Sequence, residues 1–145
     1  MKTLKFNIIA LIALAIGFAS CGGAPSSSEF VGKYQLIKVE DENDESAEVT
    51  ECDEMTIWHF TNEEAEPLVD GTEVKKVIAT APDECKYYGF DSKWTTKDGK
   101  LFISSVRTGG MGGGSNAGLF EIKEKTDDKL VLKIMKKTYT LEKVE

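Results

Sequence analysis

Residues that usually carry catalysis or bind metal are scarce in this sequence. Its 145 residues include one histidine, His59, and only three cysteines. A histidine acting as a general base needs a nucleophile and an orienting acid nearby. No serine or cysteine motif accompanies His59, which we interpret as a structural or surface residue. Zinc sites need further Cys or His ligands. We therefore expect no enzyme activity, no cofactor and no metal site.

Basic residues are also outnumbered. The chain has 18 Lys and Arg against 25 Asp and Glu, which gives a formal net charge of −7 at pH 7. An anionic surface repels nucleic acid and anionic lipid head groups. The sequence therefore predicts no nucleic-acid partner. Any attachment to a membrane has to come from something other than the protein surface.

Long apolar runs are absent except at the N-terminus. There, Lys2 and Lys5 precede the apolar residues 6–18, and small residues follow before Cys21. This order is that of a secretory signal peptide. At about 1.5 Å per residue, a helix of this run spans roughly 20 Å, short of the ~30 Å hydrocarbon core of a bilayer. We predict a signal peptide over residues 1–20. Its removal takes two lysines with it and leaves a net charge of −9.

The segment Phe18-Ala19-Ser20-Cys21 resembles the lipobox of bacterial lipoproteins, whose cysteine thiol receives a diacylglycerol before cleavage. The resemblance implies that Cys21 becomes the lipidated first residue, held by two or three acyl chains. Residues 21–29, rich in Gly, Pro and Ser, would form a flexible tether. The protein would then be anchored in the cell envelope, at the Gram-negative outer membrane, on its periplasmic face or at the cell surface. Plain secretion, with Cys21 as a spare thiol, is the alternative.

The two remaining cysteines, Cys52 and Cys85, form an even pair in a chain expected outside the cytoplasm. That compartment is oxidising, so the pair predicts a disulfide. Closing a loop of about 33 residues stabilises a fold by roughly 3–4 kcal/mol on the chain-entropy model.

Residues 30–145 show no internal repeat and no long helical period. Short runs of alternating apolar and polar residues, separated by turn residues, are typical of strands. The apolar phase switches between Leu36 and Ile37, which predicts a bulge. Short connections predict antiparallel neighbours, and a closed barrel leaves no free sheet edge. A β-sandwich is the alternative. The expected strands are 30–40, 54–61, 72–80, 86–96, 100–107, 118–124, 129–135 and 138–144.

The segment Phe30-Val31-Gly32-Lys33-Tyr34-Gln35-Leu36 resembles the Gly-x-Trp opening of lipocalins, with Tyr34 in place of tryptophan. Thr56-Ile57-Trp58-His59-Phe60 follows, and Lys137-Thr138-Tyr139-Thr140-Leu141 closes the chain. In this order the segments resemble the lipocalin-like lipoproteins of Gram-negative bacteria. The resemblance covers nearly all of residues 30–145. It implies an all-β fold, an eight-stranded antiparallel up-and-down barrel.

Eight aromatic residues can point into such a barrel. They could wall a pocket for an apolar or planar ligand, with tyrosine hydroxyls orienting it. They could equally fill the interior, because an eight-stranded barrel is only just wide enough to be packed solid or to hold one small molecule. These residues are Tyr34, Trp58, Phe60, Tyr88, Phe90, Trp94, Phe120 and Tyr139.

Two further segments invite a functional interpretation. The glycine-rich residues 107–118 lack the Lys-Ser/Thr and the helix of a phosphate-binding loop. We expect a long connection at one mouth of the barrel, either a lid carrying Arg107, Met111 and Asn116 or a simple mobile link. The acidic run 40–45 does not meet the EF-hand pattern. A solvated loop is the default interpretation, with weak divalent-ion binding as the alternative.

The sequence thus predicts a non-enzymatic, lipid-anchored barrel that binds a small apolar ligand. The alternative is a solid barrel that presents its loops to another envelope protein, as an interaction module or an inhibitor.

Overall fold

The computed structural model describes residues 25–45, 47–68, 70–107 and 115–145. The predicted signal peptide, the lipidation residue Cys21 and the predicted lid residue Met111 lie outside these ranges. Among the described residues no helix is both long and apolar enough to cross a bilayer.

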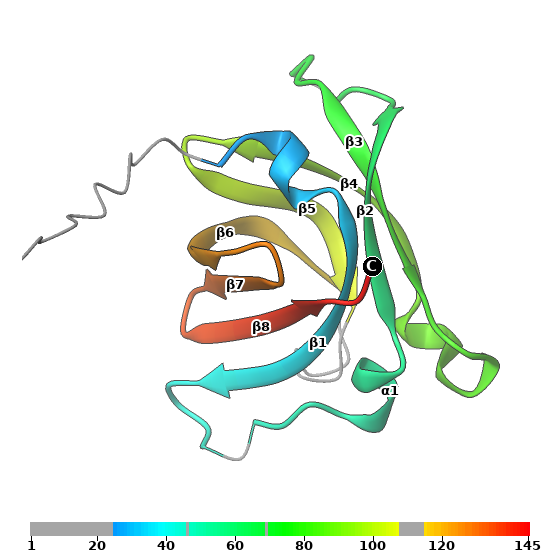
Figure 1. The fold of residues 1–145 in the computed structure, drawn as a ribbon, viewed down its shortest axis with the longest axis vertical. Helices are drawn as coiled ribbons and strands as arrows, with labels where there is room; N and C mark the ends of the chain where they lie inside the picture. The colour runs from blue at the N-terminus through cyan, green and yellow to red at the C-terminus, as the bar shows by residue number, and fades with distance from the viewer. Residues whose placement is uncertain (1–24, 46, 69, 108–114) are drawn as a thin grey trace, which may run out of the picture.

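The described chain forms one closed, eight-stranded antiparallel barrel. Each strand pairs with its neighbours in sequence, and β1 also pairs with β8 to close the barrel (Figure 1). The predicted fold class is confirmed, and the sandwich is excluded. The strands are β1 (Gly32–Asp41), β2 (Ile57–Ala65), β3 (Val74–Thr80), β4 (Phe90–Lys97), β5 (Lys100–Arg107), β6 (Ser115–Lys125), β7 (Lys129–Ile134) and β8 (Lys137–Lys143).

Alternating side chains along each strand separate the core from the surface. In β4, for example, Phe90, Ser92 and Trp94 are buried, whereas Asp91 between them is exposed. Successive strand residues point to opposite faces, so one row of each strand enters the barrel. Burying each large apolar side chain contributes roughly 1.5–3 kcal/mol. The hydrophobic effect therefore selects this register.

The predicted bulge in the first strand is confirmed. The pairing of β1 with β8 shifts between Leu36 and Lys38. Because of this extra residue, Leu36 and Val39 both point inward although they are three positions apart, and Ile37 between them is exposed.

A short helix, α1 (Glu51–Glu54), lies between β1 and β2. Thr50 caps it: its hydroxyl accepts a hydrogen bond from the Asp53 backbone N–H (3.2 Å), and the Asp53 carboxylate accepts one from the Thr50 N–H (3.0 Å). Such a capping box satisfies donors that a helix start leaves unpaired. The predicted strand 54–61 therefore begins only at Ile57.

A 3-10 helix, η2 (Asp83–Tyr88), follows β3 and occupies the start of the predicted strand 86–96. Pro82 precedes it with φ near −65°, a value suited to a helix start. The prediction was wrong for Tyr88. Its spacing from Phe90 matched a strand, but the helix turns it away from the barrel core.

The connection between β5 and β6 is shorter than predicted. Arg107 pairs with Ser115 and Val106 pairs with Asn116, so Arg107 and Asn116 lie in strands rather than in a loop spanning 107–118. Residues 115–118 are Ser, Asn, Ala and Gly, so they show no apolar alternation that would reveal the strand. At Gly118 a Cβ atom would come within 2.6 Å of the Ile134 side chain, so the strand packs closely there.

The barrel has two different ends (Figure 1). The η1 end carries the N-terminal 3-10 helix η1 (Ser27–Phe30) and the β2–β3, β4–β5 and β6–β7 connections. The α1 end carries α1, η2 and the β7–β8 turn. A disulfide between Cys52 and Cys85, with a Cα–Cα distance of 5.4 Å, joins α1 to η2. The predicted bridge therefore ties together two connections of the α1 end.

Candidate functional site

The barrel interior holds most of the aromatic residues predicted for it. Seven of the eight are buried in the core: Tyr34, Trp58, Phe60, Phe90, Trp94, Phe120 and Tyr139. Tyr88 is half-buried on η2, where its hydroxyl lies 3.4 Å from that of Thr50. The interior is therefore an aromatic-rich, apolar environment, and Tyr88 is not part of it.

Aromatic packing closes the η1 end. Phe30, fully buried on η1, lies against Trp94 with ring centroids 6.1 Å apart. Phe60 meets Trp94 edge-on at 5.4 Å, the geometry that aromatic pairs prefer. The Trp94 indole N–H also donates to the backbone oxygen of Lys76 at 3.0 Å. Phe30 was missed as a core aromatic from the sequence, although it is the first residue of the segment that resembles the lipocalin opening.

The strand ladders are less complete toward the α1 end. β1 pairs with β2 only from Gly32 to Gln35, and the rest of β1 pairs with β8. β4 pairs with β5 only from Trp94 to Lys97. Among the described residues, the α1 half of the barrel therefore has two lines along which neighbouring strands are not joined by a regular ladder.

Serine hydroxyls bridge one of these lines. The Ser92 and Ser104 hydroxyls are 2.8 Å apart. Ser104 Oγ accepts from the Lys93 N–H (3.0 Å), and Ser92 Oγ accepts from the Ser105 N–H (2.8 Å). Side-chain oxygens thus satisfy backbone donors where the β4–β5 ladder stops. These bonds link the two strands through serine hydroxyls and are not backbone ladder bonds.

Two tyrosine hydroxyls in the interior are unpaired. Tyr34 and Tyr139 are 0% and 1% exposed, and neither hydroxyl has a hydrogen-bond partner among the described residues. Leaving a buried polar group unsatisfied costs about 1–3 kcal/mol. Burial raises the pKa of both phenols above the ordinary 10.0, so both stay protonated at neutral pH. Each can therefore donate a hydrogen bond to a bound molecule.

Acidic residues dominate the connection that covers the α1 end. Residues 42–56 contain seven Asp and Glu and no Lys or Arg, and Asp41 at the end of β1 adds an eighth acidic residue. Asp53 is buried, and the charges of Asp41 and Asp53 add to burial in raising the pKa of Tyr139. The negative potential of this end therefore reaches the interior hydroxyl.

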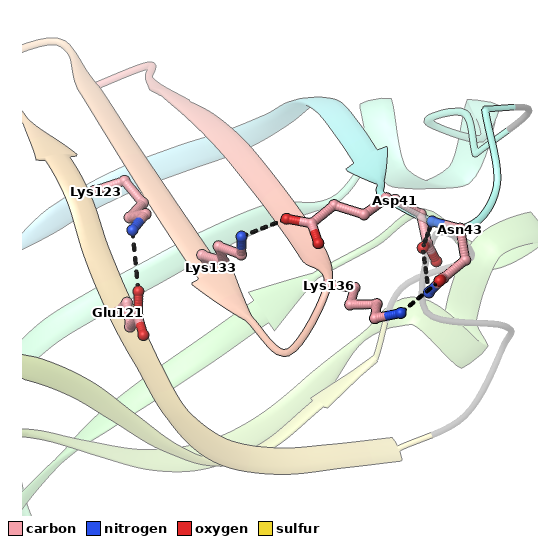
Figure 2. Close-up of polar contacts among 7 residues, drawn as sticks. Asp41, Asn43, Glu121, Lys123, Lys133 and Lys136 are labelled. Atoms are coloured by element: carbon pink, nitrogen blue, oxygen red, sulfur yellow. Dashed lines mark hydrogen bonds and ion pairs between the residues drawn. The ribbon is translucent and has the colours of Figure 1, made fainter.

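Lysines of β7 and of the β7–β8 turn engage the acidic run (Figure 2). Lys133 Nζ lies 2.5 Å from the Glu42 carboxylate, and Lys136 Nζ donates to the Asn43 side-chain oxygen at 2.7 Å. Lys133 holds the pKa of Glu42 below its ordinary value through a hydrogen bond and its charge. Lys137 lies 3.6 Å from Asp41. These carboxylates face separate lysines rather than one common centre.

Other candidate chemical groups lie apart from the interior. His59 is half-buried on β2 between the inward Trp58 and Phe60, paired with Lys33 and Ile78 of the neighbouring strands. It therefore points away from the core. Within the described ranges, no group of three or more His, Cys, Asp or Glu could hold a metal ion.

A hollow of about 270 Å³ lies on the outer surface of the barrel. Its apolar floor consists of Phe102 on β5 and Leu119 on β6, which are cross-strand partners, and Leu68 lines it from the β2–β3 connection. Leu119 is 46% exposed. This hollow was not expected from the sequence, where Phe102 and Leu119 were simply strand residues.

Comparison with known families identifies the fold. A family model described as a lipocalin-like domain matches residues 30–132, which cover β1 to most of β7. Neither a curated protein nor a solved structure gives a significant match. The matched segment is well over half of the chain, and the eight-stranded barrel agrees with it. The chain belongs to the lipocalin-like domain family.

Proposed function

We propose that this protein is a non-enzymatic binding protein of the cell envelope, whose barrel interior takes up a small apolar ligand. The observation that carries the proposal is the pair of buried, unpaired hydroxyls of Tyr34 and Tyr139 within an aromatic interior. A solidly packed core would leave both groups unsatisfied. A bound molecule supplies the missing partners. The membership in a lipocalin-like family supports the same use of the barrel.

The ligand would reach the interior from the α1 end. The opposite end is closed by Phe30 and Trp94, whose rings are packed against each other. The α1 end has incomplete ladders along β1–β2 and β4–β5 and is covered by the 42–56 connection. Displacing a connection costs less than opening a continuous ladder, because loops are the less stable elements of a fold.

We also propose that Cys21 anchors the protein through its acyl chains, at the outer membrane of a Gram-negative cell. Six Cα–Cα steps separate Cys21 from Ser27, the first residue of η1. Fully extended, they reach about 20 Å. Since η1 lies at the closed end, the anchor would hold that end toward the bilayer. The α1 end would then face away from the membrane, toward a ligand arriving through water.

Membrane fractionation tests the anchor. The Cys21→Ala variant is expected in the soluble fraction of cells in which the unaltered protein is found with membranes. Cys52→Ala, which removes a cysteine without touching the lipobox, is the matched control and should stay with the membrane. Retention of the Cys21→Ala variant in the membrane would reject the anchor.

Displacement of a fluorescent apolar probe, 1-aminoanthracene, tests the binding site. Trp58→Ala and Phe90→Ala enlarge the α1 half of the interior, where the two rings meet edge-on at 5.4 Å. They should change probe affinity several-fold. Leu119→Ala on the outer hollow is the control and should leave it unchanged. Equal probe binding by all of these variants would place the site outside the barrel.

A second candidate function is docking of an envelope protein on the outer hollow. Exposed Leu119 with Phe102 and Leu68 forms an apolar spot beside strands that otherwise carry paired charges such as Lys123 and Glu121. Exposed apolar spots rimmed by polar residues are typical of interaction sites. Under this alternative, Leu119→Ala would abolish partner capture, and the interior variants would not.

A further inference from the structure

The environment of Tyr139 constrains the polar part of a ligand. Tyr139 lies near the start of β8, at the α1 side of the core, with Val39 and Leu132 as its cross-strand partners. Its ring meets Phe120 edge-on at 6.4 Å. Its neighbours on three strands are therefore apolar, and none of them offers its hydroxyl a hydrogen bond.

The second unpaired hydroxyl lies deeper. Tyr34 is two inward positions before Val39 on β1, and its ring packs edge-on against Phe60 at 5.7 Å. A ligand that enters from the α1 end meets Tyr139 before it meets Tyr34. Tyr139 is therefore the first interior group that can bond the polar part of such a ligand, while its apolar body lies among the aromatic rings.

The charges around Tyr139 disfavour an anionic ligand. Asp41 ends β1 two residues beyond Val39, and Asp53 is buried in α1 above the same end of the barrel. A carboxylate or phosphate at Tyr139 would meet these like charges and would also lose its hydration. Lys137, two residues before Tyr139 on β8, already lies 3.6 Å from Asp41.

A cationic ligand finds no ready partner either. The Asp53 carboxylate accepts hydrogen bonds from the Thr50 N–H at 3.0 Å and the Thr50 hydroxyl at 2.8 Å. Asp41 accepts from the Asn43 N–H at 2.9 Å and lies near Lys137. Both carboxylates are thus engaged in holding the α1 connection. An ammonium group at Tyr139 would have to share these engaged carboxylates and would also lose its hydration.

We infer that the ligand of this barrel is an uncharged amphipathic molecule whose hydroxyl or carbonyl group bonds the Tyr139 hydroxyl. The inference rests on the proposed function. A phenol both donates and accepts, so it serves an alcohol as well as a ketone, ester or amide. Fatty acids and phospholipids are selected against by the acidic α1 end.

A matched series of three ten-carbon compounds tests the inference: decan-1-ol, decanoic acid and decylamine. Every described element lies after residue 25, so the mature chain carrying Cys21→Ala keeps the whole barrel without acyl chains. Isothermal titration calorimetry at pH 8 measures each affinity, with the acid and the amine both charged. Decan-1-ol is expected to bind at least about 10-fold more tightly than either charged compound, since unpaired buried charges are strongly penalised.

Tyr139→Phe then isolates the hydroxyl. The variant should bind decan-1-ol about 3- to 10-fold more weakly, the range expected for the loss of one neutral hydrogen bond. Its affinity for decanoate should stay within twofold of that of the unaltered protein. Tyr87→Phe removes an exposed hydroxyl outside the barrel and should change neither affinity. Circular dichroism of each variant checks that the barrel is intact.

The outcomes separate the two proposals. Tighter binding of decanoate or decylamine, or an unchanged affinity for decan-1-ol in Tyr139→Phe, overturns the head-group inference and leaves interior binding in place. No binding of any of the three compounds counts against the interior site itself, and with it against the inference.

Discussion

Removing the Cys52–Cys85 disulfide should destabilise the barrel strongly. The bridge closes a loop with a sequence separation of 33. The chain-entropy relation for this loop gives about 4 kcal/mol at 25 °C. Domains of this size have total stabilities of about 5–15 kcal/mol. The double variant Cys52→Ser/Cys85→Ser is therefore expected to lose a large share of its free energy of unfolding.

Urea denaturation followed by tryptophan fluorescence measures this loss, because Trp58 and Trp94 are both buried. With a slope of about 1–3 kcal/mol per molar urea, the midpoint should fall by roughly 1.3–4 M. Unaltered protein treated with reductant is the control and should unfold like the double variant. A loss below about 1 kcal/mol, or a reductant that shifts the double variant as much as the unaltered protein, would refute the reasoning.

Three further changes have defined outcomes. Phe30→Ala empties the fully buried contact with Trp94 at the η1 end and should cost about 3–5 kcal/mol in urea denaturation; a cost below 1 kcal/mol would mean that η1 does not close the barrel. The pKa values of Tyr34 and Tyr139 are raised in the folded protein, so folding favours their protonated form. Their contribution to the free energy of unfolding is therefore complete below pH 10.0 and is lost as the pH rises further. Urea midpoints should thus fall above pH 10, and less steeply in the Tyr34→Phe/Tyr139→Phe variant. Lys133→Gln should move the lowered pKa of Glu42 back up toward its ordinary 4.5 in an NMR titration, and an unmoved pKa would contradict the ion pair.

The barrel could be predicted from the sequence because its signal is local. Alternating apolar residues mark strands, and the phase change at Leu36 and Ile37 marks the bulge that the β1–β8 register contains. The disulfide was predicted from the two cysteines that remain after Cys21 is assigned to the predicted lipobox, in a chain predicted to be exported. These features depend only on residue type and spacing, and both can be read directly from the sequence.

The parts that escaped prediction depend on contacts across the fold. The α1 helix needs the reciprocal bonds of Thr50 and Asp53, and η2 turns Tyr88 out of the core in spite of its strand-like spacing from Phe90. The β6 strand starts at Ser115, among small residues that carry no alternation. The alternation of apolar and polar residues along a strand cannot show which connections fold into short helices. Nor can it show how far two neighbouring strands stay paired.

The candidate site shows the same division. Period-two alternation was enough to place seven aromatic residues inside. It could not show that the hydroxyls of Tyr34 and Tyr139 lack partners, because that depends on every strand packed around them. Nor could it relate the acidic residues Asp41 and Asp53 to Tyr139, since they are brought to one end only when the barrel closes.

Native mass spectrometry of the protein purified from its own host tests interior binding most directly. The account predicts a non-covalent adduct of one uncharged small molecule per chain, released on denaturation and reduced in Tyr139→Phe. Spectra that contain only the mass of the protein chain itself, in the unaltered protein and in the variant alike, would contradict it.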